Sequence, residues 1–237
     1  MGIINRTLGL AVLAFMVLSG YSQSEWKNDF SDPAEMLKTV GRGECNIING
    51  IFHSKGSYAC FGSPKWKNYS MSFKARAPKE AEQVQIWAGF RTYNRFDRYV
   101  VGIKGGLQDD VYLMRTGYMG TDEFMGVRPL GFHPVPGEWY SMKVEVCGNR
   151  IRVFVNEKKE PYIDVVDKNA NLTPSGGVTL GGGWIQTEYD DLVVTPLSDD
   201  FLKDVKATEY RKMAVQHIRL FSATQLSKLS RVHSSLL

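Results

Sequence analysis

The sequence predicts an all-β fold of two antiparallel sheets packed face to face, with a C-terminal helical tail. From residue 67 to residue 195, apolar side chains recur at alternate positions, which is the period of a strand with one buried face. Glycine, proline and asparagine separate these segments, and helical periodicity is nearly absent between them. Short strands without helical crossovers pack as a sandwich, which excludes a doubly wound α/β fold.

The N-terminus has the parts of a secretory signal peptide. Arg6 supplies a positive charge, and residues 8–18 form an uncharged apolar run. Gly20 and Ser22 place small side chains at the −3 and −1 positions of a cleavage site. The apolar run is too short to span the roughly 30 Å hydrocarbon core of a bilayer. We therefore expect residues 1–22 to be removed, leaving a secreted or periplasmic protein without a membrane span.

Two segments show the strand pattern most clearly. In residues 69–76 the odd-numbered side chains are apolar and the even-numbered ones are polar or charged. Residues 139–155 predict a hairpin, because both arms alternate and Asn149, which tolerates a left-handed backbone, lies in the turn. The other strand candidates are 46–53, 57–61, 83–92, 98–104, 111–115, 162–166, 176–181 and 191–195.

The character of the sequence changes after Pro196. Apolar residues between Asp199 and Arg219 follow a rough helical stripe, with acidic residues early and basic residues late, as the helix dipole favours. We therefore divide the rest of the chain into a β domain at residues 23–197 and a tail at residues 198–237. The tail is interpreted as a linker or interaction helix that leads to a partner or to a downstream catalytic domain.

The charge balance argues against nucleic acid as a partner. The chain has 29 Lys+Arg against 25 Asp+Glu, a net charge of +4, and no basic block stands out.

The cysteines leave two alternatives open. Export places Cys45, Cys60 and Cys147 in an oxidising compartment, where three cysteines allow at most one internal disulfide. Cys45 and Cys60 flank two short strand candidates and could face each other, or they could be buried free thiols. No cysteine spacing resembles a zinc site or a redox pair.

The order of several motifs resembles the concanavalin A-like lectin/glucanase jelly roll, and within it the laminin-G-like and 3-keto-disaccharide hydrolase (DUF1080) domains of exported bacterial proteins. This resemblance covers roughly residues 27–197 and implies a jelly-roll sandwich, but it does not fix an activity. The motifs that carry it are Asn28-Asp-Phe-Ser-Asp, Trp87-Ala-Gly-Phe-Arg with Arg98-Tyr-Val-Val-Gly-Ile, Gly137-Glu-Trp-Tyr with Ile151-Arg-Val-Phe-Val-Asn, Gly176-Gly-Val-Thr-Leu, and Tyr189-Asp-Asp-Leu-Val-Val.

The sequence offers no catalytic residues. A glycosidase of this fold needs two carboxylates about 5 to 9 Å apart on the concave sheet. Glu145 alternates with valines but has no carboxylate partner at a suitable spacing. Asp109-Asp110 and Asp122-Glu123 are interpreted as solvated turns and loops. The four histidines are scattered and form no triad pattern.

Aromatic and arginine residues on the strands are the stronger feature. Aromatic faces suit the C–H faces of a sugar ring, and arginine donors suit its hydroxyls. By alternation, Trp87, Gly89 and Arg91 share one face, opposite the more apolar residues of that strand. The candidate carbohydrate-binding residues are Trp87, Arg91, Arg98, Tyr112 and Trp184.

The resemblance also implies a structural calcium ion, because jelly rolls of this kind often pin their first and last strands with hard oxygen ligands. The candidate ligands are Asp29, Asp32, Asp190 and Asp191. The alternative is that Asp191 only hydrogen-bonds a neighbouring turn.

Together these features predict an exported carbohydrate-binding module, accessory to glycoside degradation. One alternative is a glycoside hydrolase similar to the 3-keto-disaccharide hydrolases, with loop carboxylates converging on Arg91. The other is a protein-interaction module that docks a partner through residues 199–237.

Overall fold

The computed structural model describes residues 24–32, 38–94, 97–105, 108–117, 122–169 and 173–203. All regular elements in these ranges are strands, so the all-β prediction is confirmed. Of the predicted tail helix, residues 199–203 are described and form turns, and the rest lies outside the described residues. The strands are β1 (Trp26–Asn28), β2 (Lys38–Ile48), β3 (Ile51–Phe61), β4 (Tyr69–Arg76), β5 (Gln85–Thr92), β6 (Arg98–Lys104), β7 (Asp110–Thr116), β8 (Glu123–Pro129), β9 (Tyr140–Cys147), β10 (Arg150–Val155), β11 (Ile163–Val166), β12 (Gly177–Gly181) and β13 (Thr187–Pro196).

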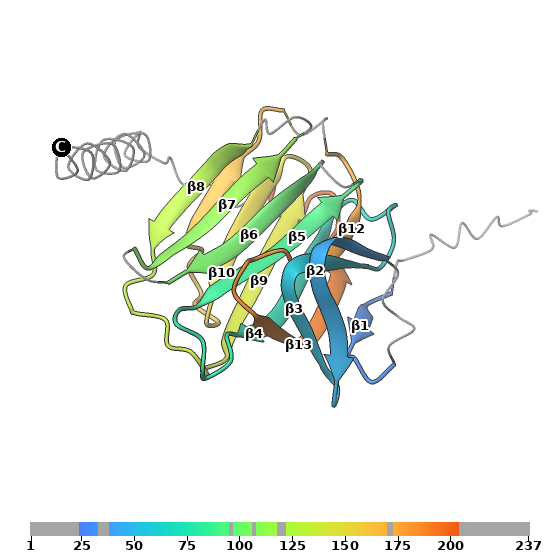
Figure 1. The fold of residues 1–237 in the computed structure, drawn as a ribbon. Helices are drawn as coiled ribbons and strands as arrows, with labels where there is room; N and C mark the ends of the chain where they lie inside the picture. Colours follow the sequence, from blue (N-terminus) through green and yellow to red (C-terminus); the bar gives the residue numbers. More distant parts are fainter. Residues whose placement is uncertain are drawn as a thin grey trace, which may run out of the picture.

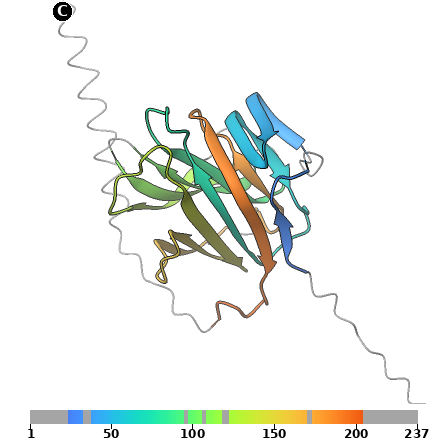
Figure 2. The same cartoon turned by 90° about the horizontal axis from the view of Figure 1, so that it is seen from below.

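The strands form two antiparallel layers that share β3. One layer has the order β11-β10-β9-β4-β13, and the other has the order β12-β5-β6-β7-β8. The first half of β3 pairs with β13 and its second half pairs with β12, so one ladder of backbone hydrogen bonds runs through both layers. In Figure 1 the layer that contains β5 to β8 lies in front of β9 and β10. Figure 2 shows β13 between β4 and β1, the first strand of the domain.

The alternation predicted from the sequence fills the space between the layers. In β4, Tyr69, Met71, Phe73 and Ala75 are buried, while the residues between them are partly or fully exposed. In β9, Tyr140, Met142 and Val144 are buried in the same core. Burying each large apolar side chain contributes about 1.5 to 3 kcal/mol, so these faces account for much of the stability of the sandwich.

The predicted hairpin and the predicted pair of short strands compare differently with the structure. The hairpin at 139–155 is confirmed, but Gly148 adopts the left-handed backbone (φ +57°), which indicates a type II′ turn in which Asn149 need not be left-handed. Segments 46–53 and 57–61 were predicted as separate strands, and this was wrong. Asn49 and Gly50 both have positive φ (+53° and +74°) and form the turn between the longer strands β2 and β3.

The cysteines are free thiols in the structure. Cys45 lies opposite Ser54 across the β2–β3 pairing, whereas Cys60 lies opposite Lys38, so the two are not cross-strand neighbours. Burial raises the pKa of the Cys45 thiol to about 11. Of the two alternatives that the sequence left open, the structure has free thiols.

The described chain continues beyond β13 and packs onto the domain. Leu197 N donates to the carbonyl of Asn68 (3.0 Å), and Asn68 Nδ2 donates to Asp199 Oδ1 (2.6 Å). The Leu202 side chain is buried, and its carbonyl accepts a hydrogen bond from Arg150. The predicted end of the domain at residue 197 therefore precedes this packed segment.

No helix in the described ranges is long and apolar enough to cross a bilayer.

Candidate functional site

A row of aromatic rings crosses the outer face of the layer that contains β5 to β8. The ring centroids of Trp87 on β5 and Tyr112 on β7 lie 5.9 Å apart, and those of Tyr112 and Phe124 on β8 lie 6.3 Å apart. Val100 and Met114 pack beside them in a small cluster separate from the main core. Phe124 is 53% exposed, so one end of this row is open to solvent.

Gly102 on β6 allows the row to form. It lies directly between Trp87 and Tyr112 in the strand pairing. A Cβ atom at this position would lie 2.5 Å from Tyr112 Oη, which is closer than real Cβ contacts. The two rings therefore meet over a strand that has no side chain of its own at this point.

Arg98 lies on the same face. Its guanidinium carbon lies 3.8 Å from the centroid of the Tyr58 ring, and only 9% of the residue is exposed. Its Nε and Nη1 atoms are buried and have no hydrogen-bond partner. Burial lowers the pKa of Arg98, because the charged form loses solvent.

Two neutral polar groups on this face are also buried without a hydrogen-bond partner. Tyr112 Oη and Thr179 Oγ1 are buried and have no hydrogen-bond partner. Thr179 adjoins Arg98, because a Cβ at Gly89 would lie 2.3 Å from Thr179 Oγ1 and 3.3 Å from Arg98 Cδ. A buried polar group without a partner costs about 1 to 3 kcal/mol, so a ligand or water that bonds these atoms would recover that free energy.

Trp184 stands at the edge of this face. It lies in the loop between β12 and β13 and is 79% exposed. The loop is held onto β5, because Trp184 N and Ile185 N both donate to Gln85 Oε1 (2.8 and 3.2 Å). A side chain at Gly183 would lie 3.2 Å from Trp87 Cδ1, so the loop passes directly beside Trp87.

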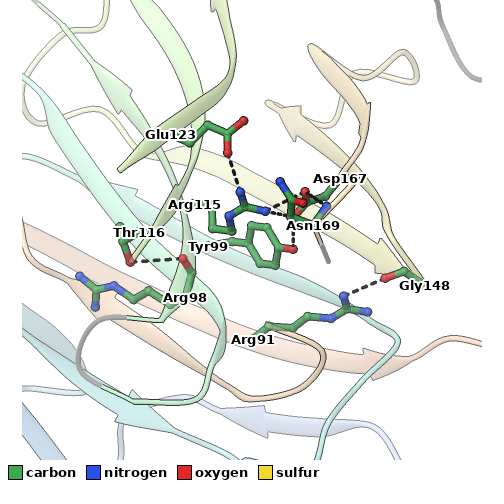
Figure 3. Close-up of polar contacts among 9 residues, drawn as sticks. All are labelled: Arg91, Arg98, Tyr99, Arg115, Thr116, Glu123, Gly148, Asp167 and Asn169. Atoms are coloured by element: carbon green, nitrogen blue, oxygen red, sulfur yellow. Dashed lines mark hydrogen bonds and ion pairs between the residues drawn. The ribbon is translucent and has the colours of Figure 1, made fainter. Parts of the chain in front are cut away.

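The start of β6, which positions Arg98, is held by a polar network shown in Figure 3. Thr116 Oγ1 donates to the carbonyl of Arg98 (3.2 Å). Tyr99 Oη donates to Asp167 Oδ2 (2.6 Å), and Arg115 Nη1 donates to both oxygens of the same carboxylate. These contacts hold the backbone at Arg98 and the side chain of the next residue, Tyr99.

Arg91 does not lie beside Trp87, so the parity argument fails at this residue. The Arg91 backbone has a φ of +46°, and the β5–β12 pairing shifts register next to it, which interrupts the two-residue alternation. The side chain is 2% exposed and donates to the carbonyls of Lys67 (2.9 Å) and Gly148 (2.8 Å) in the opposite layer. In Figure 3 the guanidinium groups of Arg91 and Arg98 point in opposite directions.

The structure therefore brings together four of the five predicted binding residues, which are Trp87, Arg98, Tyr112 and Trp184. Sequence reasoning missed Tyr58, Phe124 and Thr179. Thr179 lies in a predicted strand, and its alternation there with buried Val178 and Leu180 could have placed it on the outer face. The positions of Tyr58 and Phe124 in the site depend on which strands pair with each other, and alternation within one strand does not specify this pairing.

The aspartates expected to bind calcium do not converge. Asp29 accepts a hydrogen bond from Ser31 N (3.0 Å), and Asp191 pairs with Lys74 (2.8 Å). In the ranges that the structure describes, no group of three or more His, Cys, Asp or Glu side chains could hold a metal ion. Asp29, Asp32, Asp190 and Asp191 therefore do not fit the calcium site that the resemblance implies.

Two of the carboxylates considered for catalysis form ion pairs away from the aromatic row, whereas Glu123, next to Phe124 on β8, pairs with Arg115. Glu145 lies on β9 in the opposite layer, where it pairs with Arg152 (3.0 Å) and Lys143 (2.9 Å). Asp109 pairs with His133 (2.9 Å) near the start of β7.

No protein-family model matches the chain, and no curated protein matches it. Several solved structures share its fold. A protein described as native glycosidic hydrolase has a TM-score of 0.53 and 13% identity over 74% of this chain and 97% of its own. The exoplasmic/lumenal domain of VIP36 in a Ca²⁺/Man-bound form has a TM-score of 0.52 and 11% identity over 67% and 83% of the two chains.

A third similar structure is the CBM2 module of the evolved Dit of Lactobacillus casei BL23 phage J-1. It has a TM-score of 0.51 and 10% identity over 75% of this chain and 99% of its own. At such low identity the likeness concerns the fold. The chain thus has the jelly-roll β-sandwich of lectin- and glucanase-like domains, as the sequence resemblance implied.

Proposed function

We propose that this protein is an exported carbohydrate-binding module, whose ligand lies on the aromatic row of the β5–β8 layer. The proposal rests on one observation: aromatic rings in edge-to-face contact lie on the same outer face as buried polar groups that have no hydrogen-bond partner. Sugar rings present apolar C–H faces that pack on aromatic rings, and hydroxyls that bond to fixed donors and acceptors. Trp87 and Phe124 would supply the ring faces, while Tyr112 would bond a hydroxyl.

The exposed Trp184 supports a binding role more directly than a structural one. A tryptophan that is 79% exposed contributes little to folding through burial, whereas its loop is firmly hydrogen-bonded to β5. An exposed aromatic side chain on a fixed loop is a typical arrangement for stacking on a ligand.

The predicted signal peptide at residues 1–22 supports export, and it therefore belongs to the same proposal. An accessory role in glycoside degradation is consistent with a similar structure described as a glycosidic hydrolase. The version of the hydrolase alternative that centred on Arg91 loses its basis, because Arg91 is buried against backbone carbonyls. A partner or downstream domain reached through residues 199–237 stays a prediction.

Glycan-array screening followed by calorimetric titration of the full chain tests the proposal. We expect binding to at least one plant, host or microbial polysaccharide, with affinity reduced roughly tenfold in Trp87→Ala. The matched control is Trp139→Ala, because Trp139 stacks under Arg76 in the opposite layer and should not affect binding. Absence of binding to every glycan, or an equal loss in both variants, would contradict the proposal.

A further inference from the structure

We propose that the ligand is an acidic saccharide and that its carboxylate pairs with Arg98. This inference rests on the proposed function and specifies the chemical class of the glycan. It starts from the Arg98 guanidinium, whose Nε and Nη1 atoms have no hydrogen-bond partner and which forms no ion pair in the described structure, rather than from the aromatic rings.

Two other buried arginines of the domain have a carboxylate partner, and Arg91, which has none, donates to the backbone carbonyls of Lys67 and Gly148. Arg115 lies 2.7 Å from Asp167, and Arg150 lies 2.6 Å from Asp164. Arg98 is as buried as these two, yet it forms no ion pair within the described ranges. Asp122, which precedes β8, favours the charged form of Arg98 through space but forms no ion pair with it.

The surroundings of Arg98 stabilise the cation only in part. The centroid of the Tyr58 ring lies 3.8 Å from the guanidinium carbon, which gives a cation–π contact. This contact provides no hydrogen-bond acceptor for the N–H groups in the guanidinium plane. Nε and Nη1 therefore have unused donor capacity in a place with little water. A carboxylate from outside the protein would supply both the missing charge and the missing acceptors, and guanidinium groups bind carboxylates with strong directional preference.

The position of Arg98 next to Trp87 makes the ligand a charged sugar rather than a small anion. A Cβ at Gly182 would lie 3.8 Å from the Trp87 ring and 4.0 Å from Arg98 Nη2, so both groups border the same point. A sugar ring stacked on Trp87 would thus carry a carboxylate substituent within reach of the guanidinium. A uronic acid residue has this combination of an apolar ring face and a carboxylate.

The test compares uronate oligosaccharides with their carboxyl-reduced counterparts, which have the same linkages but no charge. Oligogalacturonate, oligomannuronate and oligoguluronate are titrated into the full chain by calorimetry, each beside its reduced form. We expect at least one uronate to bind at least about tenfold more tightly than its reduced form. This preference should weaken when sodium chloride is raised from roughly 50 mM to roughly 500 mM, because added salt screens the attraction between the two charges. The two concentrations lie on either side of 0.1 M, where the Debye length is about 10 Å.

Variants then locate the preference. Arg98→Gln should bind the uronate and its reduced form equally, whereas Arg98→Lys should keep part of the preference. Arg76→Gln is the matched control, because Arg76 pairs with Glu188 in the opposite layer and should leave the preference intact. Since the wild-type comparison needs no variant, poor folding of Arg98→Gln would not prevent the test.

Two outcomes separate this inference from the proposed function. If the chain binds a neutral glycan and no uronate is preferred over its reduced form, the acidic ligand is overturned while carbohydrate binding stands. If neither these oligosaccharides nor the wider glycan array shows binding, both proposals fail.

Discussion

Arg115 and Asp167 join the two layers at the edge of the sandwich opposite β3. Arg115 lies on β7 in one layer, and its Nη1 atom donates to both carboxylate oxygens of Asp167 (2.8 and 2.7 Å), which follows β11 in the other layer. Both side chains are buried, and Tyr99 Oη donates to the same carboxylate. One edge of the sandwich is therefore held by backbone pairing through β3, and the other by a polar side-chain cluster.

Removing the charge of Asp167 should destabilise the fold strongly. Asp167→Asn leaves the buried Arg115 paired only with the more exposed Glu123, and breaking a buried ion pair costs about 3 to 5 kcal/mol. We expect a loss of about 3 kcal/mol in the free energy of unfolding, measured with urea. The control is Asp191→Asn, whose pair with Lys74 is about half exposed and should contribute less than about 1 kcal/mol. Similar losses in the two variants would show that the cluster does not hold this edge.

The stability of the domain should fall at alkaline pH. Burial and the neighbouring Asp167 raise the pKa of Tyr99 from its ordinary value of 10.0 to about 12. The unfolded chain therefore releases this proton first, and the stabilising contribution of Tyr99 is complete below pH 10 and is lost as the pH rises toward 12. Urea unfolding between pH 9 and pH 11.5 should show this decline, and it should be less steep in Tyr99→Phe. An identical pH dependence in the variant would exclude Tyr99 as a source.

The sequence was most informative where one strand alone determines the outcome. The alternation of residues 69–76 correctly assigned Tyr69, Met71 and Phe73 to the core, because side chains of a regular strand must point to opposite faces in turn. The same rule placed Trp87 on the outer face. It failed four residues later at Arg91, because a left-handed residue at a register shift reverses the direction of a side chain.

The rest of the candidate site depends on contacts between distant segments. Tyr58 on β3 meets Arg98 on β6 only because β3 and β5 both pair with β12 and β5 also pairs with β6. Phe124 meets Tyr112 only through the β7–β8 pairing. Pairing order and register of this kind are determined by the whole core, so local patterns cannot reveal them. The missing hydrogen-bond partners of Arg98 Nε and Nη1 likewise become visible only when all described neighbours are in place.

Gly102→Ala should damage the aromatic row and the sheet together. The added Cβ would lie 2.0 Å from the carbonyl oxygen of Ile86 and 2.5 Å from Tyr112 Oη, so the β5–β6 pairing has to shift. Overpacking of this kind costs about 1 to 3 kcal/mol, and the Trp87 ring should move away from Tyr112. Urea unfolding and tryptophan fluorescence would record both effects. Gly105→Ala is the control, since its closest contact would be 3.2 Å and a smaller loss is expected.

Trp184→Ala should separate binding from stability. The side chain is 79% exposed and its loop is held by backbone donors to Gln85, so the variant should unfold at the same temperature as the wild type. If the exposed ring stacks on the ligand, affinity for the glycan should fall roughly tenfold. Phe201→Ala removes another exposed aromatic side chain, which lies in the segment after β13, and should leave affinity unchanged. An unchanged affinity in Trp184→Ala would confine the binding site to Trp87, Tyr112 and Phe124, while a lower unfolding temperature would show that Trp184 supports the fold instead.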